Sequence, residues 1–209
     1  MLTKSTEIFR KQIGYYVVKT LNVIGNLFTR RRRQPESTHT ISEIDVFDDR
    51  INEFYDGIKG HFSFMVERSR DYLNWRYCDF RGGDYVVRQF EEGGRVLGYV
   101  VLRVNRFREE YPTGYVVDLL TLPDRPDVAE ALVSDAVGYF DGLGVNVVRY
   151  WVIKNHPYEK IFKKHGFVSF WKRAPVVIFG PRSLNEDWDE FRGAPENRLH
   201  FQMGDTEWM

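Results

Sequence analysis

The apolar run YVVDLLTL, residues 115–122, carries one acidic side chain, Asp118, near its middle. The run is rich in Val and Leu and predicts a β-strand, on which Asp118 shares a face with Val116 and Leu120. A carboxylate among apolar neighbours needs either a cleft, where it could act as a general base, or a cationic partner. Two interpretations of Asp118 therefore stand: a proton acceptor, or half of a structural ion pair with an arginine on a neighbouring strand. The candidate arginines are Arg103 and Arg149.

A second group of polar side chains lies in NHPYEKIFKKHGF, residues 155–167. The stretch predicts a short helix that ends at Gly166. Tyr158, His156 and His165 could each transfer a proton, and each could equally be a surface or helix-capping residue.

The junction LLTLPDRPDVAEALV, residues 119–133, joins the strand to a predicted helix. Pro126 suits the first turn of a helix and Asp127 suits its N-terminus. Backbone N–H groups at such a junction can hold a phosphate, which Arg125 could partner. The junction has no glycine to let a phosphate approach the backbone, and its carboxylates repel one. A helix start that needs no ligand is the alternative.

Composition limits the classes of function. The 209 residues are 43% hydrophobic and 16% aromatic, which is enough for one domain with a sizeable core. The formal net charge is zero, which argues against nucleic acid as a general partner. Cys78 is the only cysteine, so a reducing, cytoplasmic setting is expected. The five histidines show no metal-ligand spacing, and no metal is predicted.

The first 33 residues hold eight basic side chains and one acidic side chain. Residues 6–28 read as a helix with apolar residues on more than one side, and Arg30 to Arg33 follow it. This segment could pack on a partner or contact a membrane surface or nucleic acid, and a solvated linker is the alternative. The predicted organisation is a basic helical extension and linker over 1–40, a domain over 41–182, and an irregular tail over 183–209 that packs on the domain.

The order of elements predicts the fold class. Residues 47–77 read as two helical pieces, the second of which carries Trp75 and Arg76. A hairpin and a β-α-β unit follow, which predicts an α/β (α+β) fold with a mixed, mostly antiparallel sheet, helices on both faces, and a preceding N-terminal helix. The predicted strands are 84–90, 95–104, 115–122, 145–153 and 174–180, and the helices between them are 126–144 and 156–167.

This order resembles the GNAT superfamily of acyl-CoA N-acyltransferases over roughly residues 45–180. RDYLNWRY (70–77) and the closing GDTEW (204–208) are similar to one half of tandem GNAT proteins. The likeness also rests on the strand that ends in Leu-Pro before a helix (115–133), the hairpin strand LGYVVLR (97–103), and Asn155, Phe162, Gly166 and Phe167.

The resemblance implies that an amine of a small molecule or a protein attacks the thioester of acetyl-CoA or another acyl-CoA. It also implies that the fourth strand, here 115–122, pairs through its backbone with the pantetheine arm, and that the next helix start holds the pyrophosphate. By position, the cofactor would contact Leu120, Thr121, Leu122, Arg125, Asn155 and Phe162. Asp118 would be the base, Tyr158 the acid, and Trp75 and Arg76 would face the substrate.

Two positions depart from the family pattern. The junction PDRPDVAEAL lacks the family's glycines, and Phe162 stands where a tyrosine often serves as the acid. A homodimer mate or a second GNAT half could supply what this chain lacks. The alternative function is a catalytically silent GNAT-fold module for dimerisation or for binding a partner or ligand.

Overall fold

The computed structural model describes residues 7–19, 39–106, 112–153, 155–180 and 198–206, and for 7–19 and 170–180 it describes the strands without their side chains. Within these residues the main sheet has seven strands in the order β2-β4-β5-β6-β7-β1-β8. Only β6 and β7 run parallel, and the other neighbours are antiparallel. The strands are β1 (Glu7–Lys19), β2 (His39–Ile44), β4 (Val86–Glu92), β5 (Arg95–Asn105), β6 (Thr113–Thr121), β7 (Val147–Ile153) and β8 (Val168–Gly180). A separate parallel pair joins β3 (Phe64–Met65) to β9 (Leu199–His200).

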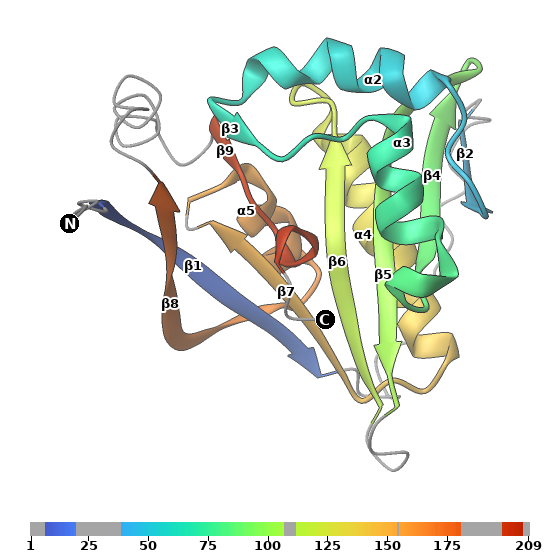
Figure 1. Ribbon diagram of the computed structural model, residues 1–209. Helices are drawn as coiled ribbons and strands as arrows, with labels where there is room; N and C mark the ends of the chain where they lie inside the picture. The colour runs from blue at the N-terminus through green and yellow to red at the C-terminus, as the bar shows by residue number, and fades with distance from the viewer. Residues whose placement is uncertain (1–6, 20–38, 107–111, 154, 181–197, 207–209) are drawn as a thin grey trace.

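Helices cover both faces of the sheet (Figure 1). On one face lie α2 (Arg50–Ile58) and α3 (Arg70–Leu73), which continues into a π-helical turn, Asn74–Cys78. On the other face lie α4 (Pro126–Gly142) and α5 (Pro157–Lys164). Short 3₁₀ turns span Lys59–His61, Phe80–Gly82 and Met203–Asp205. This arrangement confirms the predicted mixed α/β fold with helices on both faces.

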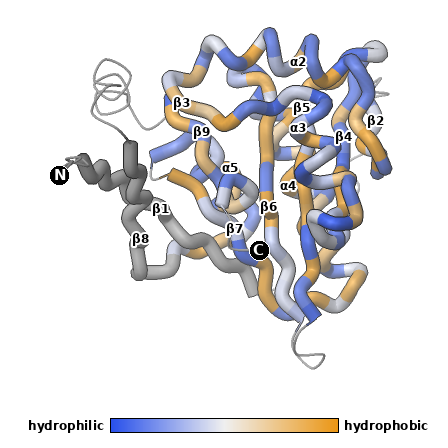
Figure 2. The backbone as a smooth tube through the Cα atoms, in the orientation of Figure 1, coloured by the Kyte–Doolittle hydropathy of each residue, from blue (hydrophilic) through white to orange (hydrophobic). Residues whose placement is uncertain are grey.

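The core follows from the apolar spacing of the elements. Helix α4 begins at Pro126 and buries Val128, Leu132, Ala136 and Phe140, which lie four residues apart on one side. Figure 2 shows that hydrophobic residues concentrate along the middle strands and alternate with hydrophilic ones along the helices. A second buried cluster lies between the opposite face of the sheet and α2 and α3.

The predicted N-terminal helix over 6–28 is wrong for residues 7–19, which form strand β1. This strand lies between β7 and β8 and pairs antiparallel with both. A run of Ile, Tyr and Val with apolar residues at both alternating positions is also what a central strand requires, so local pattern alone does not separate the two states. Residues 7–19 therefore belong to the sheet of the domain, while 20–28 and the arginine run lie outside the described residues.

Candidate functional site

Strands β6 and β7 part near the middle of β6. Their parallel pairing runs from Thr113 with Val147 to Val116 with Tyr150. The pairing of β6 with β5 continues as far as Thr121. From residue 117 onward β6 therefore has no strand on its β7 side among the described residues.

A β-bulge lies where the two strands part. Asp118 faces Val101 of β5 and Val116 faces Leu102, so Val117 is the extra residue. The bulge breaks the alternation of the strand: Val116 packs in the core beneath α4, whereas Val117 and Asp118 face α2 and α3. The predicted common face of Asp118 and Val116 is wrong for this reason.

Asp118 lies at the centre of a fully buried polar cluster. Its Oδ2 atom is 2.9 Å from Nε of Arg68 and accepts hydrogen bonds from the hydroxyls of Tyr99 (3.1 Å) and Tyr77 (3.2 Å). Burial alone would raise the pKa of Asp118, but the Arg68 guanidinium, His200 and the Tyr99 hydroxyl together outweigh it and lower the pKa from 3.8 to about 2. Asp118 is therefore ionised at neutral pH and is a weak proton acceptor.

The partner of Asp118 is Arg68, and not Arg103 or Arg149. The guanidinium of Arg103 lies over the ring of Tyr85, and that of Arg149 over Tyr115. Sequence patterns gave no reason to select Arg68, because it precedes α3 and is 50 positions away from Asp118 in the chain.

Arg68 joins Asp118 to the C-terminal segment. Its Nη2 atom is 2.6 Å from Oδ1 of Asp205, with both side chains fully buried. Its Nη1 atom donates to the carbonyl oxygen of Val66. Two carboxylates therefore share one buried guanidinium, and the closing GDTEW stretch contributes one of them.

Gln202, in the same C-terminal segment, pairs with the free edge of β6. Its Oε1 atom accepts a hydrogen bond from the backbone N–H of Leu119, and its Nε2 atom donates to the carbonyl oxygen of Leu119, both at 2.8 Å. Gln202 is buried. No sequence signal identified this residue, since a glutamine in an irregular tail has no pattern of its own.

Tyr158 occupies the next position along the same edge. Its hydroxyl accepts a hydrogen bond from the backbone N–H of Thr121 (2.9 Å) and lies 3.0 Å from the Thr121 hydroxyl. Burial raises the pKa of Tyr158 to about 12, so that it keeps its proton at neutral pH.

Two buried histidines lie beside this edge, with ring centroids 6.1 Å apart. His156 caps α5 by accepting from the N–H of Tyr158 (3.3 Å), and burial together with His200 lowers its pKa to about 3. His200 lies 3.5 Å from Asp118 through its Nε2 atom. His156 is thus a neutral capping residue.

Arg125 is held by carboxylates at the start of α4. Its Nη1 atom lies 2.9 Å from Glu92 and its Nη2 atom 2.7 Å from Asp127. Pro126 follows as the first helical residue, as predicted. A phosphate at this helix start would have to compete with both acids for the guanidinium.

The remaining predicted cofactor residues differ in accessibility. Asn155 is exposed and has a positive φ of 68°. Phe162 lies in the core, stacked on Tyr150 with ring centroids 3.6 Å apart. Leu120 is buried on the α2 side of the sheet, and the Leu122 N–H donates to Leu97.

The two predicted substrate residues lie on the π-helical turn. Trp75 is 61% exposed and packs against Tyr72. Arg76 donates to the backbone carbonyl oxygens of Gly204 and Thr206, both at 3.2 Å. Arg76 therefore fastens the C-terminal segment, and Trp75 is a surface residue.

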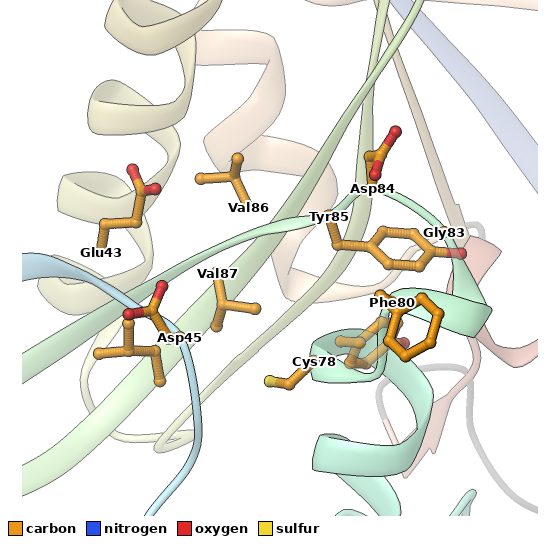
Figure 3. A pocket seen from close by; sticks show the side chains of 11 residues that line it. Glu43, Asp45, Cys78, Phe80, Gly83, Asp84, Tyr85, Val86 and Val87 are labelled. Atoms are coloured by element: carbon orange, nitrogen blue, oxygen red, sulfur yellow. The ribbon is translucent and has the colours of Figure 1, made fainter.

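A pocket of about 310 Å³ opens elsewhere, between β2, the start of β4 and the π-helical turn (Figure 3). None of the predicted site residues lines it. It is bordered by Glu43, Ile44, Asp45, Tyr77, Cys78, Phe80, Gly83, Asp84, Tyr85, Val86 and Val87. In the part of the chain that the structure describes, no group of side chains could hold a metal ion, and no helix has the length and apolar character to cross a membrane.

Comparison with known proteins identifies the fold. No protein-family model matches the chain, and no curated protein matches its sequence. Among solved structures, a functionally unknown conserved protein from Staphylococcus epidermidis superposes with a TM-score of 0.52 and 13% identity, covering 84% of this chain and 63% of that one. A probable N-acyltransferase from Enterococcus faecalis superposes with a TM-score of 0.55 and 14% identity, covering 83% of this chain and 41% of that one.

The chain has the GNAT fold. The chain spans less than two thirds of the length of either relative. At identities of 13% and 14%, the likeness concerns the fold alone.

Proposed function

We propose that this chain is an acyl-CoA-dependent N-acyltransferase domain that moves an acetyl or longer acyl group to an amine. The observation that carries the proposal is the parting of β6 from β7 directly after the bulge at Val117. Where the strands part, the backbone N–H and C=O groups of β6 have no strand partner, and such groups can pair with an extended amide ligand as they would with a strand. The Enterococcus relative, described as a probable N-acyltransferase, has the same fold.

The reaction assigns different tasks to Tyr158 and Asp118. The amine nitrogen bonds to the thioester carbonyl carbon, the C–S bond breaks, and the nitrogen releases a proton to solvent. The departing thiolate takes a proton from Tyr158, which regains one from solvent. Tyr158 is buried at the edge of β6 and protonated at neutral pH, as this acid must be. Asp118 is paired with Arg68 and accepts hydrogen bonds from the hydroxyls of Tyr99 and Tyr77. These contacts suit a residue that positions its neighbours better than they suit the base.

The test is release of free CoA thiol from millimolar acetyl-CoA in the presence of a panel of amines. Wild-type protein is expected to release thiol with at least one amine, and Tyr158→Phe to reduce kcat with little change in the KM for the amine. Tyr55→Phe is a matched control because Tyr55 is only partly buried and lies beside the exposed Lys59. Thiol release that never exceeds the protein-free rate would refute the proposal.

A catalytically silent GNAT-fold half, which dimerises or binds a partner or ligand, is the second candidate. The observation that favours it is the pairing of Arg125 with Glu92 and Asp127, which engages the cation at the start of α4 within the chain itself. Such a half would release no thiol from acyl-CoA with any amine, whereas the transferase must.

A further inference from the structure

The described C-terminal segment, residues 199–206, runs along the part of β6 that has left β7 (Figure 1). Its residues Leu199, His200, Gln202 and Met203 are buried. The segment is therefore packed into the domain beside this edge of β6.

The segment and α5 satisfy the edge of β6 where a ligand would pair. The N–H groups of Leu119 and Thr121 are two residues apart and point to the same side of the strand. The N–H of Leu119 donates to Oε1 of Gln202, and the N–H of Thr121 donates to the hydroxyl of Tyr158. The Gln202 amide also donates to the carbonyl of Leu119.

The side-chain amide of Gln202 bonds to β6 as an extended amide ligand would. A carboxamide that accepts from one backbone N–H and donates to the carbonyl of the same residue makes the same pair of bonds as a peptide strand. The pantetheine arm of CoA carries two amide groups with the same donors and acceptors. Gln202 thus presents to β6 the same hydrogen-bond donor and acceptor that an amide of the pantetheine arm would present.

Anchors on the α2 and α3 side hold the segment in place. Asp205 pairs with the buried Arg68, and Arg76 donates to the carbonyl of Gly204. Gly204 lies so close to Tyr77 that a Cβ atom there would be 2.0 Å from the Tyr77 hydroxyl. The segment consequently stays on β6 unless a competing ligand replaces its bonds.

We infer that residues 199–206 occupy the position of the pantetheine arm, and that acyl-CoA binds this chain only by displacing Gln202 from Leu119. The inference rests on the proposed function, because it assumes that acyl-CoA pairs with β6. It makes Gln202 the residue that sets the affinity for the acyl donor. The chain then has a latent donor groove that its own C-terminal segment closes.

Calorimetric titration with acetyl-CoA tests this inference. Gln202→Ala leaves both backbone groups of Leu119 free and is expected to tighten binding by about tenfold or more, since two hydrogen bonds are recovered and each is worth about fivefold. Gln89→Ala is the matched control: Gln89 is a buried glutamine that bonds to Glu91, and its loss should leave the affinity unchanged. Tyr158→Phe frees Thr121 and provides a second variant should Gln202→Ala fail to fold.

Hydrogen exchange on the wild-type protein gives an independent reading. Saturating acetyl-CoA should speed amide exchange within 199–206, because the displaced segment loses its protection. Micromolar binding without faster exchange there, and without tightening in Gln202→Ala, would overturn the inference and leave the acyltransferase proposal standing. If the wild type, Gln202→Ala and Tyr158→Phe all fail to bind millimolar acetyl-CoA, both proposals fall and the silent half remains.

Discussion

Arg68 and Asp118 form an ion pair in which Nε and Oδ2 are 2.9 Å apart and both side chains are fully buried. The same guanidinium reaches Asp205, so it links the bulge of β6 to the C-terminal segment. A buried ion pair contributes little over apolar packing, but a buried charge without its partner is costly.

Arg68→Met should therefore destabilise the domain by about 3–5 kcal/mol, because it leaves two buried carboxylates without a cation. Urea unfolding followed by circular dichroism would measure the loss. Arg50→Met is the control, since Arg50 forms partly exposed ion pairs with Asp48 and Glu91 and should cost under about 1 kcal/mol. Equal losses from the two variants would contradict the central role of Arg68.

His156 should make stability depend on pH. Its pKa in the folded protein is lowered from 6.5 to about 3, so the unfolded chain binds the proton first. Stability is therefore expected to fall as pH drops from 6.5 toward 3, with a slope of up to about 1.4 kcal/mol per pH unit from this group. His156→Asn keeps a capping side chain and should flatten the decline between pH 6.5 and 5, whereas the exposed His61→Asn should not. Urea unfolding midpoints of the wild type and both variants, measured between pH 6.5 and 5, would test this dependence. Identical slopes of stability against pH in the wild type and His156→Asn would rule out His156 as the cause.

Gly204→Ala should displace the C-terminal segment, because its Cβ would lie 2.0 Å from the hydroxyl of Tyr77. We expect a loss of about 1–3 kcal/mol in the free energy of unfolding. Tyr77→Phe removes the clashing oxygen, so Gly204→Ala should cost less in that background than in the wild type. Gly138→Ala is the matched control: Gly138 is exposed within α4 with nothing near its missing Cβ, and alanine there should stabilise by about 0.5–1 kcal/mol. Additive effects at positions 204 and 77 would show that the two residues do not meet.

Arg125→Ala should leave the affinity for acetyl-CoA within about twofold, since its guanidinium already engages Glu92 and Asp127. Glu92→Gln combined with Asp127→Asn should free the guanidinium and tighten binding, with an affinity that weakens at high salt. Titrations at two salt concentrations would test both statements. A large loss of affinity in Arg125→Ala would show that this arginine binds the phosphates in spite of its acidic partners.

Local sequence was sufficient to predict the elements that depend on residues close together in the chain. Helix α4 begins at Pro126 as expected, because proline fits the first helical turn and the apolar residues after it recur at helical spacing. The β4–β5 hairpin was predicted from its EEGG turn, in which Gly93 and Gly94 take positive φ values. The mixed sheet with helices on both faces follows from the order of these elements.

Local sequence failed where distant neighbours decide the state. Residues 7–19 became a strand because β7 and β8, more than a hundred positions away, supply hydrogen bonds on both sides. Likewise, the bulge at Val117 places Asp118 and Val116 on opposite faces of the sheet. The alternation of apolar and polar residues does not predict where a strand carries an extra residue.

The sequence by itself determined the GNAT-like order of strands and helices, the position of Asp118 on β6, and a glycine-free start for α4. Only the tertiary structure decided that Arg68 neutralises Asp118 and that Gln202 closes the edge of β6. The physical reason is the range of the interactions: backbone preferences act over a few residues, whereas a buried charge and an unpaired strand edge are satisfied by whichever groups the fold brings to them.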